Sequence, residues 1–461
     1  MTASPDRRRR PVSLWLDTLP APLRERRPAL SGDVRADVVV VGAGFTGLWT
    51  AYYLTELAPQ ASVLVIDAER VAYGASGRNG GWCTTEMPAL LANLVQRYGP
   101  MDAMRFYRAG RRTLDEIERV LAAEDIDCGW RRDGSLYVAR TQPQVARLRN
   151  WQDMRLKLGI TDMTLLSPAE TADRVGVAGA LLSGFTPHCA AVQPAVIAAG
   201  LARAVERRGV TIVEGTRAVG LRPGVVVTDR GTIRARSVLC TTEAYTRELP
   251  GHARRVLPVI SRVLATEPLP EWRWREAGWR DRVTVADSRY QFAYFQRTAD
   301  GRLLVGGRGA GYRAGSRPDA TARSGARVFA RLRESLAESF PALADARVSH
   351  QWSGAYGMHR DGEPAVVYDR DSGLGHAGGY GGEGIALSNL AGRTLAALVA
   401  GVNRPETRLF WTGHRPRRWE PEPLRAVGVR TVSALATAAD RYEDRLRRTA
   451  PLAAAVMRTV L

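Results

Sequence analysis

Residues 38–54 read VVVVGAGFTGLWTAYYL, and this stretch decides the fold. The run of four valines predicts a buried strand of a parallel sheet. It leads directly into GAGFTG at 42–47, a G-x-G-x-x-G, after which apolar residues recur at helical spacing. In such a turn Gly42 permits the bend, Gly44 lets the backbone approach a pyrophosphate, and Gly47 lets the helix pack on the strand. The stretch therefore predicts the strand, turn and helix that open a dinucleotide-binding βαβ unit.

Two further segments support this prediction. The next apolar strand, SVLVID, ends at Asp67, where a carboxylate can accept hydrogen bonds from ribose hydroxyls. The glycine-rich segment 71–82, VAYGASGRNGGW, is unsuited to a helix and indicates a loop whose backbone approaches a ligand. A second glycine run, GGRGAGYRAG at 306–315, leads into Ser-Arg-Pro instead of a helix. We therefore interpret that second run as a turn at the end of a strand.

The composition is that of an ordinary globular protein. Of 461 residues, 45% are hydrophobic and 25% are charged, and the chain is long enough for two or three domains. The formal net charge is +19, and Lys157 is the single lysine. The positive charge is therefore almost all arginine, and it is spread along the chain. This pattern indicates a coding bias, so a nucleic-acid partner is not expected.

Cysteine spacing and hydropathy predict a cytoplasmic protein. The four cysteines are far apart and form no C-x-x-C, so we expect free thiols and no metal site. The run Arg7–Arg10 is similar to the start of an export signal, but Asp17 and Pro20 interrupt the apolar stretch that should follow. No stretch is long enough to cross a bilayer, so no transmembrane segment is expected.

The periodicity of the remaining chain predicts a first sheet that is completed late. Strands near 210–242, including a hairpin that turns at 229–231, and a further strand near Gly378 would rejoin this sheet. Residues 257–343 predict antiparallel strands with aromatic faces and one helix, typical of a substrate domain. Other expected elements are helices over 87–124, 144–158 and 193–208 and a hairpin over 130–139.

The motifs resemble those of the FAD-dependent oxidoreductases of the D-amino-acid oxidase type, a superfamily that includes glycine and sarcosine oxidases. The resemblance covers Ala36 to about Leu424 and is closest to the γ-glutamylputrescine-oxidase-like branch. FAD is favoured over NAD because the sheet is rejoined late and a second dinucleotide fold is absent. The stretches that carry the resemblance are VVVVGAGFTGL, VIDAER, GASGRNGG, LPVISRVLATEPL, GRLLVGGRGAGYR, WSGAYGMHRDGEP and GGYGGEGIALSNLAGR.

The resemblance implies an α/β fold with a discontinuous Rossmann-like FAD-binding domain and a second, mainly antiparallel α+β substrate domain.

In the C-terminal extension, one helix face is formed by Val429, Val432, Ala436, Ala439 and Tyr442. We expect this face to pack on the body, with a partner or membrane surface as the alternative. The implied boundaries are 1–34 for an N-terminal arm, 35–90, 185–250 and 350–401 for the FAD-binding domain, 91–184 and 251–349 for the substrate domain, and 402–461 for the extension.

The resemblance also implies where FAD binds. The glycine turn would hold the pyrophosphate, Asp67 the adenosine ribose, and the start of the late helix the pyrimidine edge of the flavin, where a helix N-terminus stabilises negative charge. Val219, in the turn after the strand VTIVEG, would meet the adenine. The implied cofactor-binding residues are Gly42, Ala43, Gly44, Phe45, Thr46, Gly47, Asp67, Ala68, Arg70, Ser76, Arg78, Asn79, Gly80, Gly81, Val219, Gly379, Gly382, Gly384 and Ile385.

The implied reaction is oxidation of a C–N bond of an amine or amino acid by hydride transfer to flavin N5, after which the imine hydrolyses. Glu383, at the start of a helix, would attract an ammonium substrate to an exposed pocket mouth. The candidate catalytic residues are Glu383, His359, Tyr380, Arg308 and Tyr356, and Trp82 and Tyr294 are further pocket candidates.

Three departures from the family pattern refine this expectation. No cysteine falls where sarcosine oxidases attach their flavin, so FAD is expected to be non-covalent. The lysine that promotes the oxygen reaction is missing from the strand RLLVGG, so either oxygen is a poor acceptor or another cation such as Arg308 takes the place of the lysine. The electron acceptor is accordingly O2 or a quinone or other carrier. Arg360 stands next to Asp361, so an amine without an α-carboxylate is favoured. Alternatives are a D-amino-acid dehydrogenase, or a basic flavoprotein that acts on RNA or holds FAD structurally.

Overall fold

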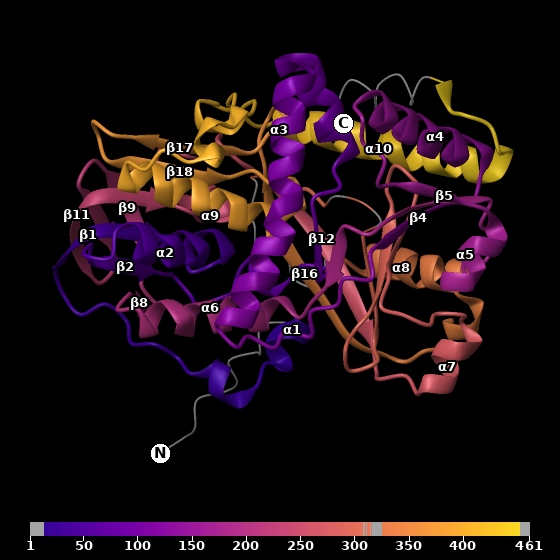
Figure 1. Cartoon of the computed structure of the whole chain (residues 1–461), viewed down its shortest axis with the longest axis horizontal. Coiled ribbons are helices and arrows are strands. Elements are labelled where there is room, and N and C mark those ends of the chain that lie inside the picture. Colours follow the sequence, from indigo (N-terminus) through magenta and orange to yellow (C-terminus); the bar gives the residue numbers. More distant parts are fainter. Residues whose placement is uncertain (1–12, 308, 310, 314, 316–324, 452–461) are drawn as a thin grey trace.

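The computed structural model describes residues 13–451 except 308, 310, 314 and 316–324. Two eight-stranded sheets form its two halves, and the long helix α3 (Pro88–Ala123) stands between them in Figure 1. The first sheet is mostly parallel and the second mostly antiparallel. The predicted two-domain α/β fold is therefore confirmed.

The first sheet has the order β17-β18-β11-β1-β2-β8. Successive side chains of its strands point to opposite faces of the sheet and pack into two apolar layers. Val38 and Val40 pack with α2, α6 and α9, whereas Val39 and Val41 pack on the face toward β9 and β10. The elements are β1 (Val34–Val41), β2 (Val63–Ile66), β8 (Thr211–Val213), β9 (Ala218–Arg222), β10 (Val225–Thr228), β11 (Gly231–Cys240), β17 (Ala365–Asp369), β18 (Leu374–Gly378), α2 (Phe45–Leu57), α6 (Pro194–Arg207) and α9 (Gly384–Ala400).

The glycine turn between β1 and α2 has the geometry that its sequence predicts. Gly42 adopts a φ of 112°, a conformation that side chains rarely permit. A Cβ at Gly47 would lie 1.9 Å from the carbonyl oxygen of Gly42. Only glycine at position 47 therefore lets the first turn of α2 pack against the end of β1.

The second sheet has the order β16-β12-β15-β14-β13-β4-β6-β5, and of these neighbours only β13 and β4 are parallel. Its elements are β4 (Ser135–Ala139), β5 (Thr164–Leu166), β6 (Leu182–Thr186), β12 (Leu257–Thr266), β13 (Thr284–Asp287), β14 (Ala293–Arg297), β15 (Leu303–Gly307), β16 (Val348–Met358), α4 (Gln142–Lys157), α5 (Pro168–Arg174), α7 (Glu271–Glu276) and α8 (Ala326–Ser339). Residues 350–358, assigned above to the FAD-binding domain, thus lie on a strand of the second sheet.

One predicted hairpin is wrong. Residues 130–139 do not pair with each other: Arg131 bridges Ala191, and β4 lies between β13 and β6. The turn at Gly134 is real, but its N–H donates to the carbonyl of Cys189, in the short β7 (Cys189–Ala191) that pairs with β3 (Trp82–Thr84). Distant partners therefore replaced the local pairing that the turn residues suggested.

The predicted helices form, and the N-terminal arm docks on the body. The helix predicted over 87–124 is α3, which bends at Gly99 (φ 81°) before Pro100. In the arm, α1 (Leu14–Asp17) buries Trp15, whose indole N–H donates to the carbonyl of Asn79 at 2.8 Å. Within the described part of the chain, no helix has the length and apolar content to cross a membrane.

The C-terminal extension crosses between the two halves. After Trp411, which is fully buried, the chain reaches α10 (Leu424–Leu446), drawn in yellow in Figure 1. An ion pair of 2.8 Å between Arg147 of α4 and Glu443 places the two helices side by side. The extension is therefore part of the folded body.

Candidate active site

A single large cavity contains most of the predicted site residues. Its volume is about 1570 Å³, and its lining comes from the glycine turn, the ends of β2 and β11, the loop 73–80, strands of the second sheet, the start of α9, and α10. The predicted cofactor-binding residues that line it are Gly42, Gly44, Phe45, Thr46, Asp67, Ala68, Ser76, Arg78, Asn79, Gly80, Gly382, Gly384 and Ile385.

The remaining predicted cofactor residues lie behind this lining. Ala43 donates its N–H to Asp67 Oδ2 at 2.8 Å, and Gly47 packs against Gly42. Gly81 has a φ of 73° and follows Asn79, whose Oδ1 accepts its N–H. Gly379 and Arg70 are also not among the described residues that line the cavity. These residues shape the loops that face the cavity.

The N-terminus of α2 suits a pyrophosphate. Gly44 is its N-cap and provides no side chain to cap the helix, while Gly44, Phe45 and Thr46 all line the cavity. Phe45 donates its N–H to Ser76 Oγ at 2.8 Å, which holds the loop 73–80 against the helix start. A helix N-terminus attracts an anion, so this end of the cavity fits the phosphates of FAD.

Asp67 lies at the end of β2, where a ribose would bind. Both its carboxylate oxygens accept backbone hydrogen bonds at 2.8 Å, from Ala43 and Glu69. Burial raises the pKa of Asp67 to about 6, against the effect of these hydrogen bonds. Because its carboxylate still lines the cavity, further acceptor positions face the ligand.

The placement predicted for Val219 is wrong. Val219 lies on β9, not in a turn, and is 44% exposed. The cavity in this region is lined by the preceding residues Thr216, Arg217 and Ala218. The connection after β8 covers residues 214–217, because β9 begins at Ala218.

Glu383 is the N-cap residue of α9 and lines the cavity beside Gly381 and Gly382, which are exposed. It is half-buried, and its side chain does not cap its own helix. Burial raises the pKa of Glu383 to about 8, and the negative charge of Glu86, which lines the same cavity, adds to the shift. A carboxyl group with this pKa can both hold an ammonium ion and take a proton from it.

Aromatic side chains form walls near Glu383. The ring of Tyr294 lies between two glycines, since a Cβ at Gly80 would come within 2.4 Å of it and a Cβ at Gly306 within 2.2 Å. Trp82 meets Tyr294 edge to face, with ring centroids 5.7 Å apart. Tyr356 of β16 also lines the cavity, and burial raises its pKa to about 12, so its hydroxyl stays protonated at neutral pH.

Tyr380 and His359 support the loop that precedes α9. The Tyr380 hydroxyl is 3.0 Å from Thr46 Oγ1 and so connects this loop to α2. His359 is buried, its Nδ1 is 2.7 Å from the carbonyl oxygen of Glu363, and burial lowers its pKa. A Cβ at Gly379 would lie 2.2 Å from this ring. Both residues line the cavity, whereas Arg308 lies outside the described residues.

Glu243 is a site residue that the sequence analysis missed. It follows β11, has a φ of 47°, and its Oε2 accepts the N–H of Gly379 at 3.1 Å. Burial raises the pKa of Glu243 to about 7, against the effect of these backbone hydrogen bonds. Glu243 therefore fastens the turn before α9 to the first sheet. The available signal was its position directly after a parallel strand, where ligands bind in α/β sheets.

Most of the arginines around the cavity are neutralised. Of the seven arginines among the described lining residues, Arg78 donates to the carbonyls of Tyr73 and Ser353. The other six pair with carboxylates: Arg97 with Glu363 (2.6 Å), Arg147 with Glu443 (2.8 Å), Arg217 with Glu248 (3.0 Å), Arg289 with Asp287 (3.0 Å), Arg360 with Glu420 (2.9 Å) and Arg425 with Glu422 (3.1 Å).

Known proteins share this fold and these motifs. The chain matches the FAD dependent oxidoreductase (DAO) family over residues 37–398, and it therefore belongs to that family. It is 31% identical over 389 residues to the gamma-glutamylputrescine oxidoreductase of Escherichia coli K12, covering 81% of this chain and 85% of that protein. A probable oxidoreductase OrdL of Rhizobium meliloti is 30% identical over 399 residues, covering 85% of this chain and 90% of that protein.

The solved structures agree with the fold. The glycine oxidase of Geobacillus kaustophilus superposes with a TM-score of 0.67 at 21% identity, covering 83% of this chain and 99% of that chain. The protein is thus an FAD-dependent oxidoreductase, and the resemblance found in its motifs is confirmed. The individual contacts to FAD, and its non-covalent attachment, stay predictions.

Proposed function

We propose that this enzyme oxidises the C–N bond of an amine that carries no carboxylate on the reacting carbon. The observation that carries the proposal is Glu383, a half-buried carboxyl group that faces the same cavity as the FAD-binding residues. An ammonium ion is the natural partner of such a group. A relative named for gamma-glutamylputrescine, an amine, supports this substrate class.

The charges around the cavity argue against an amino acid as substrate. A substrate α-carboxylate needs a cation that is not already paired, and six of the seven described arginines that line the cavity pair with carboxylates of this chain. The seventh, Arg78, lies in the loop beside the start of α2 and is better placed for FAD. A D-amino-acid dehydrogenase therefore has less support, and so does a role in which FAD is only structural.

The chain's own groups would prepare the substrate. When bound, FAD supplies the acceptor for the hydride of the substrate α-carbon. Glu383 binds the ammonium group and takes one of its protons, which leaves the neutral amine from which a hydride can depart. Trp82, Tyr294 and Tyr356 hold the α-carbon in place and reduce access of water. The imine product then hydrolyses to an aldehyde and ammonia.

The electron acceptor and the location follow from weaker signals. The chain's single lysine, Lys157, is exposed on α4. It therefore does not correspond to the lysine that promotes the oxygen reaction in members of the family. We expect the acceptor to be a quinone or other carrier rather than O2, although O2 stays the alternative. The four cysteines are free and buried, which supports a cytoplasmic location.

Anaerobic reduction tests the proposal. Purified enzyme is mixed without oxygen with monoamines, polyamines and D- and L-amino acids, and loss of the visible flavin absorbance is followed. We expect amines to bleach the flavin and to yield aldehydes. Bleaching by D-amino acids alone would overturn the proposal in favour of a dehydrogenase of that class, and the absence of bleaching by any amine would remove the amine substrate.

A further inference from the structure

One face of α10 forms a wall of the cavity that contains Glu383. The residues involved recur at helical spacing, so they belong to a single face of the helix, on which Leu424 is 64% exposed and Gly428 is also exposed. They are Leu424, Arg425, Gly428, Val429, Val432, Ser433 and Ala436. The predicted helix face was thus assigned correctly for Val429, Val432 and Ala436, but these side chains line a cavity. Tyr442 instead is 41% exposed.

The adjoining wall carries apolar and aromatic side chains, from Leu148 and Trp151 of α4 and from Tyr290 and Phe292 in the loop 288–292. Asp287 and Arg289 line it as well, but they are paired with each other at 3.0 Å. The guanidinium of Arg147 lies over the ring of Tyr290 at 4.3 Å and is paired with Glu443, so it presents no unpaired charge to the cavity. This part of the cavity therefore suits an uncharged, apolar ligand group.

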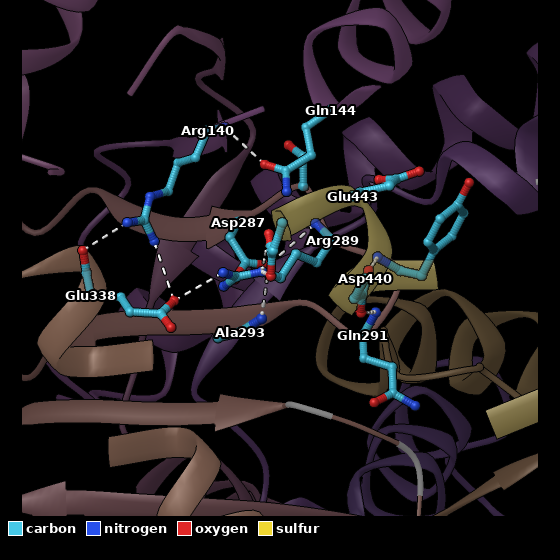
Figure 2. Close-up of polar contacts among 12 residues, drawn as sticks. Arg140, Gln144, Asp287, Arg289, Gln291, Ala293, Glu338, Asp440 and Glu443 are labelled. Atoms are coloured by element: carbon cyan, nitrogen blue, oxygen red, sulfur yellow. Dashed lines mark hydrogen bonds and ion pairs between the residues drawn. The ribbon is translucent and has the colours of Figure 1, made fainter. Parts of the chain in front are cut away.

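Buried polar contacts fix α10 in this position (Figure 2). The carboxylate of Asp440, 4% exposed, accepts the N–H of Tyr290 at 2.8 Å and the N–H of Gln291 at 2.9 Å. Arg289 joins Asp287 at 3.0 Å and Asp444 at 3.1 Å. Because the loop 288–292 and α10 are held together by buried charged groups, the wall is a built part of the site.

We propose that α10 and the loop 288–292 form a subsite for an apolar or aromatic arm of the amine substrate. This inference rests on the proposed function, since it assumes that the amino group is held at Glu383. The subsite lies in the same cavity as Glu383, so one extended molecule can fill both. The family match ends at residue 398, so α10 lies outside the part of the chain that the family description covers.

The subsite predicts a dependence on chain length. Burial of each additional methylene stabilises a complex enough to raise kcat/KM about three- to fourfold. In a series of n-alkylamines, kcat/KM of the wild-type enzyme should rise in these steps until the arm meets α10. A terminal ammonium group should abolish the gain, so a diamine should be a far poorer substrate than the alkylamine of equal length.

Two substitutions on the inward face test the assignment. Gly428→Phe adds a ring where a Cβ has no heavy atom within 4 Å, and Val432→Phe enlarges a half-buried lining residue. Both should raise KM for long alkylamines at least about tenfold more than they raise it for the shortest amine. Ala434→Phe, on the exposed face of the same helix, is the matched control and should change neither.

The outcomes separate this inference from the proposed function. If amines bleach the flavin but both inward variants treat long and short amines alike, the subsite is wrong while the amine substrate stands. A preference for diamines over alkylamines would also overturn the apolar subsite. If no amine bleaches the flavin, the proposed function fails first.

Discussion

At the scale of single residues, Glu383 is the group that we propose prepares the amine for reaction. It sits at the start of α9 inside the cavity, and burial raises its pKa to about 8. If Glu383 only attracted the substrate from an exposed mouth, salt would screen its effect. A half-buried group that contacts the substrate ammonium acts at short range, so its effect should persist at high salt.

Glu383→Gln should therefore impair the reaction beyond substrate binding. We expect kcat/KM for a carboxylate-free amine to fall by at least about a hundredfold, because the variant can take no proton. The kcat/KM of the wild-type enzyme should rise as the pH increases through about 8, where Glu383 ionises, and this rise should be missing in the variant.

Steady-state kinetics across pH and salt check this prediction. Glu25→Gln, whose carboxylate is 80% exposed, is the control and should behave as wild type. If Glu383→Gln retains the pH dependence and full kcat, the role of Glu383 in proton transfer is refuted.

The same raised pKa affects stability. The folded protein holds the Glu383 proton more tightly than the unfolded chain, because its pKa rises from 4.5 to about 8. The resulting stabilisation is fully present below pH 4.5 and is lost as the pH rises through about 8. The free energy of unfolding of the apoprotein should thus decline over this range.

Urea unfolding of the FAD-free protein at several pH values measures the decline. Glu383→Gln should make it smaller without removing it, since Glu243, with a pKa raised to about 7, contributes in the same direction. An identical decline in wild type and variant would show that Glu383 titrates normally.

At the scale of elements, the contact between β1 and α2 requires that residue 47 be a glycine, which has no side chain. Gly47→Ala places a Cβ 1.9 Å from the carbonyl oxygen of Gly42, which is backbone and cannot move aside as a side chain would. We expect a loss of at least about 2 kcal/mol in the free energy of unfolding, together with weaker FAD binding. Chemical unfolding and titration with FAD provide the two measurements.

A second glycine provides the control for this substitution. Gly413→Ala, where a Cβ would have no heavy atom within 4 Å, should leave both stability and FAD binding unchanged. Wild-type FAD affinity in Gly47→Ala would mean that the glycine turn tolerates a displaced helix, and the account of this turn would be wrong.

At the scale of the whole molecule, local patterns predicted the cofactor end of the site and little of the substrate end. The turn at Gly42 and the acid at Asp67 follow from residues close in sequence, so the motif was sufficient. The pairing of Arg131 with Ala191 and the bond from Gly379 to Glu243 join distant segments. The inward face of α10 has the same pattern whether it meets a core or a cavity, so its role required the three-dimensional arrangement.

The placement of the cysteines bears on how the flavin is held. All four are buried, and none is among the described residues that line the cavity. We therefore expect the purified protein to be yellow and to release its flavin into the supernatant on acid precipitation. Colour that remains in the pellet would demonstrate a covalent bond, with His359, which lines the cavity, as the first residue to examine.

The most direct test of the central claim compares phenethylamine with D- and L-phenylalanine, which differ from it only by the α-carboxylate. Each is mixed anaerobically with the enzyme, and the rate of flavin bleaching is measured by stopped flow. The paired arginines and the carboxyl group of Glu383 predict fast bleaching by phenethylamine and much slower bleaching by either phenylalanine. Faster bleaching by a phenylalanine than by phenethylamine would contradict the account.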